Sequence, residues 1–284
     1  MTAIPLALAI MMIAADPAQA PSAEAVERLQ AVHWEEAAKW RMYLDEQHKT
    51  ESQLRKKPVY LWTNPTRGGG QHGAVFVWTH GGRPVVVGST FSHPEKQQRM
   101  LCHEFHSLAT GKLLPTRKEG EGWQPKAPVK LLPLSGSEAP AASRSKRLLQ
   151  MRALSREFSA YSIDYHKERW ELRLLPQPLF RYEEPQKDVI DGALFAFVTS
   201  AGTDPEVVLA IEARGDADKA TWYYCAVRFS DSDLHVSRAG KQVYSSVRDE
   251  QNQLHFSPDH TYRLIRDRYL ETDPLPLPSE PVDP

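Results

Sequence analysis

The densest group of potential metal ligands in the sequence is the run Cys102-His103-Glu104-Phe105-His106. Zinc accepts imidazole, thiolate and carboxylate ligands, so the residue types fit a zinc site. The spacing fits less well, because the H-E-x-x-H motif separates its histidines by one helical turn and this run is one residue shorter. On a strand, His103 and His106 would point to opposite faces. We therefore name His103 and His106 as metal candidates, but expect a strand with two incidental histidines and predict no cofactor.

Acidic side chains in the second half offer a different chemistry. Glycoside hydrolysis needs two carboxyl groups that flank a sugar bond. The candidates are Asp204, Glu206, Glu212, Glu183 and Glu184. Positions in a turn or at a strand end explain these residues better, and nothing in the sequence sets the distance between them. We predict no catalytic residue.

Two cysteines, Cys102 and Cys225, leave two alternatives open. In an oxidising compartment they could form one disulfide across more than a hundred residues, worth up to roughly 4–5 kcal/mol in the chain-entropy model. Both also lie in apolar segments, where a free cysteine behaves as a small hydrophobic residue.

Most of the chain carries the pattern of strands and turns. The runs 74–79 and 84–89 flank Gly81-Gly82, and glycine supplies the positive φ that a hairpin turn needs. Apolar and charged residues alternate over 170–174, which is typical of a half-buried strand. The run 193–199 is continuously apolar, which indicates a strand covered on both faces.

Two segments have helical periodicity. Apolar residues recur at three- and four-residue steps between Val26 and Leu44, and Ser145 to Ser159 has an apolar face. The run 261–270 is expected to close the C-terminal sheet. The predicted fold class is β-rich α+β: antiparallel sheets with two helices, the C-terminal half forming a β-sandwich or curved sheet. No internal repeat at a fixed period is evident.

The composition predicts the domain organisation. We expect a signal peptide at 1–20, an N-terminal α+β domain at 21–112, a Pro-rich linker or long loop at 113–144, a C-terminal helix and antiparallel β domain at 145–272, and a disordered Pro-rich tail at 273–284.

The N-terminus carries the features of an export signal. Ile4 to Ala15 is an apolar run, too short for the roughly twenty residues that span a bilayer. The small-residue site Ala18-Gln19-Ala20 follows it. The alternative is an apolar N-terminus of a cytosolic protein, since the first residues carry no Lys or Arg and Pro21 follows the cleavage site. We predict a secreted or periplasmic protein without a membrane span.

The charge of the chain excludes one class of partner. Removing residues 1–20 removes only Asp16 and leaves 35 acidic and 35 basic side chains. Proteins that bind nucleic acid need a clear basic excess, so we predict no nucleic-acid partner.

Four strings resemble, as a set, a group of uncharacterised exported proteins of planctomycete bacteria. They are Trp62-Thr63-Asn64-Pro65-Thr66-Arg67, His103-Glu104-Phe105-His106-Ser107-Leu108-Ala109, Leu174-Leu175-Pro176-Gln177-Pro178-Leu179-Phe180-Arg181-Tyr182, and Gly202-Thr203-Asp204-Pro205-Glu206 with Ile211-Glu212-Ala213-Arg214. The resemblance covers most of the mature chain. It implies export and a bacterial source, and it implies no activity and no functional residues.

Two hypotheses for function follow from the sequence. The first is an exported soluble binding or interaction module without catalytic activity, whose partner is another exported protein or a cell-surface polymer. The second is an exported hydrolase, metal-assisted or not, with a site formed by His103, Glu104 and His106.

Overall fold

The computed structural model describes residues 23–64, 70–96, 98–118, 122–184, 188–200, 202–216, 219–247 and 259–270. The predicted signal peptide and the Pro-rich tail lie outside these residues. The described chain folds into two helices, α1 (Ala23–Ala38) and α2 (Arg144–Ser155), and into antiparallel sheets. The predicted β-rich fold with two helices is therefore confirmed. Ser143 caps α2 by accepting a hydrogen bond from Lys146 N, and the helix ends earlier than predicted because β9 begins at Phe158.

The first sheet has the order β17-β6-β5-β4-β2, and β3 pairs with a different part of β4. Its strands are β2 (Gln53–Leu54), β3 (Tyr60–Asn64), β4 (Gln71–His80), β5 (Arg83–Glu95), β6 (Gln98–Ser107) and β17 (Tyr262–Tyr269). The predicted hairpin around Gly81-Gly82 joins β4 to β5, and both glycines have positive φ.

The second sheet has the order β16-β15-β9-β10-β12-β13-β14-β8, and β11 also pairs with β12. Its strands are β8 (Leu132–Pro133), β9 (Phe158–Ile163), β10 (Arg169–Leu174), β11 (Phe180–Glu184), β12 (Val189–Val198), β13 (Pro205–Arg214), β14 (Thr221–Arg228), β15 (Asp233–Arg238) and β16 (Lys241–Ser246). This sheet curls like half a barrel, as the predicted curved sheet requires.

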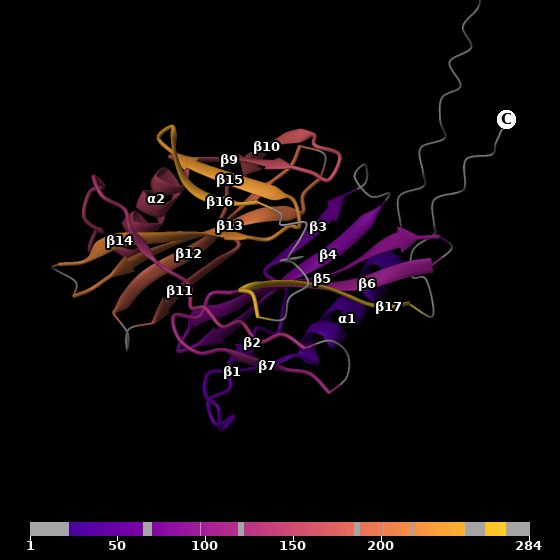
Figure 1. Ribbon diagram of the computed structural model, residues 1–284. Coiled ribbons are helices and arrows are strands. Elements are labelled where there is room, and N and C mark those ends of the chain that lie inside the picture. The colour runs from indigo at the N-terminus through magenta and orange to yellow at the C-terminus, as the bar shows by residue number, and fades with distance from the viewer. Residues whose placement is uncertain are drawn as a thin grey trace, which may run out of the picture.

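The two sheets pack face to face, and a helix covers the outer face of each one (Figure 1). In β4, Val75 faces the second sheet while Phe76 packs in the cluster that includes residues of α1. In β12, Leu194 faces the first sheet while Phe195 packs with residues of α2. Strands covered on both faces need apolar residues at every position, which explains the continuous apolar run at 193–199.

The two halves of the chain are interlocked through this arrangement. The prediction that 261–270 closes the C-terminal sheet is wrong, because β17 pairs with β6 and completes the first sheet. The segment 113–144, predicted as a linker or long loop, contributes two short strands. These are β7 (Leu114–Thr116), which pairs with β1 (Arg41–Tyr43), and β8, which pairs with β14. The buried cluster between the sheets draws residues from both halves, so they share one core.

The fold contains an internal duplication, which the sequence does not display as a repeat at a fixed period. The order α1-β1-β2-β3-β4-β5-β6 is matched by α2-β9-β10-β11-β12-β13-β14. The strand registers also match: Trp62, Gly73 and Phe91 are paired in a row across β3, β4 and β5. The corresponding row across β11, β12 and β13 consists of Tyr182, Gly192 and Glu212.

An aromatic ring covers a glycine at the centre of each repeat. A Cβ atom added to Gly73 would lie 2.3 Å from Cε2 of Trp62, and one added to Gly192 would lie 2.5 Å from Cε2 of Tyr182. Any side chain at these two positions would displace a buried ring. The glycines therefore let the rings of β3 and β11 lie flat on the neighbouring strand.

Replacing Gly73 by Ala is expected to lower the free energy of unfolding by about 1–3 kcal/mol, because overpacking forces the Trp62 ring out of its position. Urea denaturation measures the change. The matched control is Gly111→Ala, since nothing lies within 4 Å of a Cβ atom there. We expect the control to stay within about 0.5 kcal/mol of the wild type. Equal effects of the two substitutions would contradict the close contact at Gly73.

Candidate functional site

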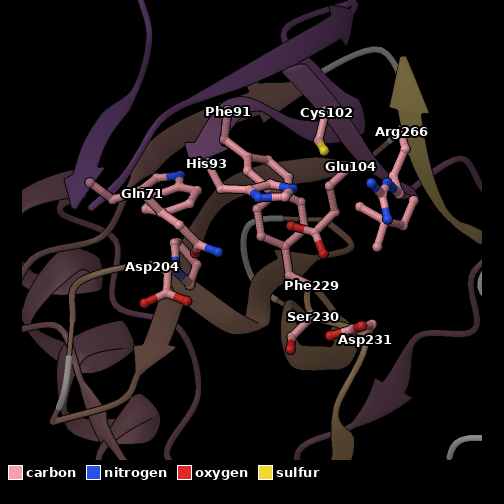
Figure 2. Close-up of a pocket in the computed structure, with 13 residues that line it drawn as sticks. Gln71, Phe91, His93, Cys102, Glu104, Asp204, Phe229, Ser230, Asp231 and Arg266 are labelled. Carbon is pink, nitrogen blue, oxygen red and sulfur yellow. The ribbon is translucent and has the colours of Figure 1, made fainter. Parts of the chain in front are cut away.

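A cavity of about 310 Å³ opens between the two sheets at one end of their interface. Its lining includes Trp62, Phe91, Glu104, Asp204, Phe229 and Asp231. Figure 2 shows Glu104 extending from the first sheet toward Ser230 and Asp231, with Asp204 facing the same hollow. The cavity thus joins aromatic surface to several carboxylates. Its volume is at the lower end of the range for small-molecule sites, about 300–1,000 Å³.

Glu104 is a buried acid of this cavity. Glu104 is only 8% exposed. Tyr262 Oη donates a hydrogen bond of 2.5 Å to its Oε1. Burial raises the pKa of Glu104 well above its usual range, and the nearby carboxylates of Asp231, Asp204 and Glu206 raise it further. The hydrogen bond from Tyr262 opposes these effects without cancelling them. Glu104 is therefore a carboxyl group that holds its proton unless a positive charge approaches it.

Two basic side chains, Arg266 and His93, also line the cavity. Arg266 lies at the rim, and its guanidinium group pairs with Glu95. His93 also lines the cavity, and its Nδ1 lies 3.1 Å from Pro94 O. Asp204 Oδ1 accepts a hydrogen bond of 3.1 Å from the amide of Asn64. The lining of the cavity thus contains the acids Glu104, Asp204 and Asp231 together with Arg266 and His93.

The opposite end of the sheet interface is closed by a buried ion pair. Arg83 Nε lies 2.7 Å from Glu212 Oε1, and the two side chains are 5% and 0% exposed. Tyr182 Oη donates to the same carboxylate oxygen at 2.8 Å, and Arg214 Nη1 donates to the other oxygen at 2.6 Å. Burial disfavours the charge of Arg83, but Glu212 outweighs this effect and raises the pKa of Arg83. This end contains a satisfied charge network.

The internal duplication makes these two ends equivalent positions. We call them the Glu104 end and the Arg83 end. The strand register makes Trp62 equivalent to Tyr182, Phe91 to Glu212, and Glu104 to Cys225. Pro84 is likewise equivalent to Pro205. The residues before these prolines, Arg83 and Asp204, are therefore also equivalent. The Arg83 end holds a network of paired charges, whereas the Glu104 end holds the cavity.

Strand geometry separates the predicted metal candidates. Glu104 and His106 face the second sheet from β6: Glu104 lines the large cavity, and His106 lines a small pocket with Arg228 and Tyr262. His103 points to the other face, where its ring contacts Trp40 at the end of α1. The site proposed from His103, Glu104 and His106 is therefore not assembled in this structure.

His103 instead belongs to the group of potential metal ligands found among the described residues, together with Glu36 and Asp267. Basic side chains already occupy the two carboxylates. Arg117 binds Asp267 at 2.9 and 2.7 Å. Glu36 accepts hydrogen bonds from the basic side chains Lys39, Arg117 and Arg268. Burial lowers the pKa of His103 despite its contact with Asp267. We interpret the cluster as a charge network that holds α1 against β6 and β17.

The two cysteines are free thiols, so the alternative of a Cys102–Cys225 disulfide does not hold in this structure. They lie in different sheets, on β6 and β14. Burial raises the pKa of each thiol to about 12. Both thiols are therefore poor nucleophiles.

The carboxylates considered from the sequence do not form one site. Glu183 and Glu184 lie beside the Gly81-Gly82 turn. Asp204 and Glu206 lie near Glu104, whereas Glu212 lies in the ion pair of the Arg83 end. The sequence did not indicate Asp231, Arg266 or the aromatic lining. No local signal could have identified these residues, because the cavity joins strands that are more than a hundred positions apart in the chain.

No helix among the described residues is long and apolar enough to cross a membrane. No protein-family model, curated protein or solved structure matches this chain. The resemblance to exported planctomycete proteins stays a prediction. The cavity and its acidic lining are therefore the features from which function is inferred.

Proposed function

We propose that this protein is a binding module whose ligand occupies the cavity at the Glu104 end. The observation that carries this proposal is the difference between the two equivalent ends. The same backbone frame is filled by the pair Arg83–Glu212 at one end, whereas it encloses about 310 Å³ at the other. Packed side chains could fill the Glu104 end in the same way. Instead, this end contains a cavity, and the buried acid Glu104 lies at the position equivalent to Cys225.

On the basis of the predicted signal peptide, we propose that binding takes place outside the cytoplasm, in a secreted or periplasmic protein. The sequence-based hypothesis of an exported partner protein or a cell-surface polymer is retained in a narrower form. A cavity of this size admits a small molecule or the end of a chain, and it does not admit a protein surface. We therefore propose a small ligand or a terminal group of a polymer.

A panel of four probes tests the binding function by isothermal titration calorimetry. The probes are n-butylguanidinium, n-butylurea, butyrate and 4-nitrophenyl β-glucoside. We expect saturable binding of at least one probe, and a loss of at least tenfold in affinity when Gln71→Trp fills the cavity. Gln71 points into the hollow (Figure 2), and it is half-buried at the start of β4.

The control variant is Glu51→Gln, which lies in an exposed pair with Arg41. We expect it to bind as the wild type does. Absence of saturable binding for all four probes, or binding that Gln71→Trp leaves unchanged, would overturn the proposed site.

One observation favours a hydrolase as the second candidate function. A carboxyl group that holds its proton near other carboxylates is the arrangement of a general acid with a base, as glycoside hydrolysis requires. Glu104 would give its proton to the leaving oxygen, and Asp204 or Asp231 would take a proton from the attacking water. Release of 4-nitrophenol by the wild type and not by Glu104→Gln would favour this alternative over simple binding.

A further inference from the structure

We propose that the ligand of this cavity is a sugar residue, with its ring stacked on Trp62 and its hydroxyl groups bonded to Glu104 and the polar side chains beside it. This inference rests on the proposed binding function and specifies its ligand class. Three observations carry it: the aromatic wall of the cavity, the mixed polar groups that border the same hollow, and the content of the equivalent Arg83 end.

The first sheet supplies an aromatic wall to the cavity. Trp62 and Phe91 both line it, and their ring centroids lie 5.5 Å apart. The Trp62 indole lies against Gly73, and its Nε1 donates a hydrogen bond of 3.0 Å to Ser89 Oγ. The polar atom of this ring is therefore bonded within the first sheet, and the ring offers the cavity an apolar surface. The negative face of an aromatic ring attracts the weakly positive C–H groups of a sugar ring.

Polar side chains of different kinds border the same hollow. Gln71, Glu104, Ser230 and Asp231 line the cavity, and Figure 2 shows them around one space. Amide and hydroxyl side chains both donate and accept hydrogen bonds, and carboxylates accept them. Sugar hydroxyl groups also donate and accept, so they match such a mixed lining. A purely apolar ligand would cover these groups without bonding to them, which costs free energy.

Glu104 offers a hydroxyl group both a donor and an acceptor. Burial raises the pKa of this carboxyl group well above its usual range, so it keeps its proton. Tyr262 Oη donates to Oε1, which places the carboxyl proton on Oε2. A sugar hydroxyl can accept a hydrogen bond from Oε2, and a second one can donate to the remaining lone pair of Oε1. This pairing requires no charge on the ligand.

The Arg83 end shows how the chain fills the same frame from within. Tyr182 and Glu212 lie there at the positions equivalent to Trp62 and Phe91. Tyr182 Oη and Arg83 Nε both donate to Glu212 Oε1, at 2.8 and 2.7 Å. At the Glu104 end, the same two positions carry aromatic rings that border a volume of about 310 Å³. A stacking surface thus replaces the phenol and carboxylate of the closed end, and a sugar brings hydroxyl groups into the space in front of it.

Four methyl glycosides test the ligand class by isothermal titration calorimetry on the full chain. They are methyl β-glucoside, methyl β-galactoside, methyl α-mannoside and methyl N-acetyl-β-glucosaminide. We expect saturable binding of at least one of them. The matched probe 2-methoxytetrahydropyran has the same ring and methoxy group but no hydroxyl groups. It should bind at least tenfold more weakly, because it leaves the polar lining without partners.

A free sugar and the terminal residue of a polymer present the same ring to the cavity. A disaccharide that ends in the sugar bound most tightly distinguishes these sources. Binding at least as tight as that of the methyl glycoside identifies a chain end as the ligand. Binding at least tenfold weaker identifies a free sugar.

Trp62→Phe tests the stacking surface, because it replaces the indole by a smaller ring. We expect at least a fivefold loss of affinity and the loss of the change in tryptophan fluorescence on binding. The matched control is Trp222→Phe. Trp222 packs with residues of α2, and its Nε1 has no hydrogen-bond partner among the described residues. This control should bind as the wild type does and keep the fluorescence change.

Glu104→Met tests the carboxyl group, because it keeps the length of the side chain and removes its hydrogen bonds. We expect at least a tenfold loss of affinity for the glycoside, whereas Glu51→Gln should bind as the wild type does. Thermal denaturation shows whether Glu104→Met is folded. If it is not, the comparison of the glycosides with 2-methoxytetrahydropyran in the wild type decides the matter.

The outcomes separate this inference from the proposed function. Binding of 2-methoxytetrahydropyran, butyrate or n-butylguanidinium that is as tight as binding of every glycoside, and that Gln71→Trp abolishes, would keep the binding function and overturn the sugar. Absence of binding for all four glycosides would also overturn the sugar. Glycoside binding that neither Gln71→Trp nor Trp62→Phe changes would overturn both.

Discussion

Replacing Glu212 by Gln is expected to lower the free energy of unfolding by about 3–5 kcal/mol. The substitution keeps the size of the side chain but leaves the guanidinium group of Arg83 buried without its counter-ion. Arg83 is 5% exposed in its side chain, and its other hydrogen bonds go to the uncharged carbonyl groups of Pro84 and Leu108. Guanidinium denaturation of the wild type and the variant measures the loss.

A double-mutant cycle tests the origin of this effect. Arg83→Met with Glu212→Gln removes both charges, so the double variant should be more stable than the sum of the single effects predicts. Glu51→Gln is the matched control, because its pair with Arg41 is exposed and is worth at most about 1 kcal/mol. Additive effects of the two buried substitutions would show that the pair does not act as a unit.

Stability is expected to fall on acidification from about pH 6.5 toward pH 4, because two buried histidines resist protonation in the folded state. Burial, with the positive charge of Arg99, lowers the pKa of His33 to about 3, and burial lowers the pKa of His106 to about 4. In the unfolded chain each imidazole takes up a proton near pH 6.5. The unfolded state therefore binds more protons in this window, which costs about 2 kcal/mol per histidine at pH 5.

Variants isolate this effect from that of Glu104, which acts in the opposite direction. Burial raises the pKa of Glu104, so this group favours the folded state as it takes up a proton on acidification. His33→Leu should reduce the loss of stability between pH 6.5 and 4 by about 1.4 kcal/mol for each pH unit. The control substitution His166→Leu, at an exposed histidine, should leave this loss of stability unchanged. Urea denaturation across this range measures the slopes, and parallel curves for wild type and His33→Leu would refute the role of His33.

Local patterns in the sequence predicted the local elements of this fold. The Gly81-Gly82 turn, the alternation over 170–174 and the apolar run at 193–199 each report on neighbouring residues, and each gave the correct strand. Odd spacing on a strand also predicted that His103 and His106 would face apart. These features depend on the periodicity of the backbone and on turn chemistry, which a single sequence displays directly.

Features that depend on distant parts of the chain could not be predicted in this way. The duplication was missed because the equivalent positions drift: Trp62 and Tyr182 are 120 residues apart, but Gly73 and Gly192 are 119 apart. Turns of different length therefore hide the period. The cavity was missed because Glu104 and Asp204 come together only when the two sheets stack. Their charges look like those of any surface turn until the fold buries them.

Each repeat is completed at the edge of its sheet by a strand from outside that repeat, and this affects how the chain folds. The last strand of the first repeat, β6, is bordered by β17, which is synthesised after the whole second repeat. The last strand of the second repeat, β14, is bordered by β8, which precedes that repeat. Neither repeat can complete its sheet by itself, so the first must wait for the end of the chain. The molecule should therefore fold and unfold as one cooperative unit, and a cut between the repeats would leave two fragments that depend on each other.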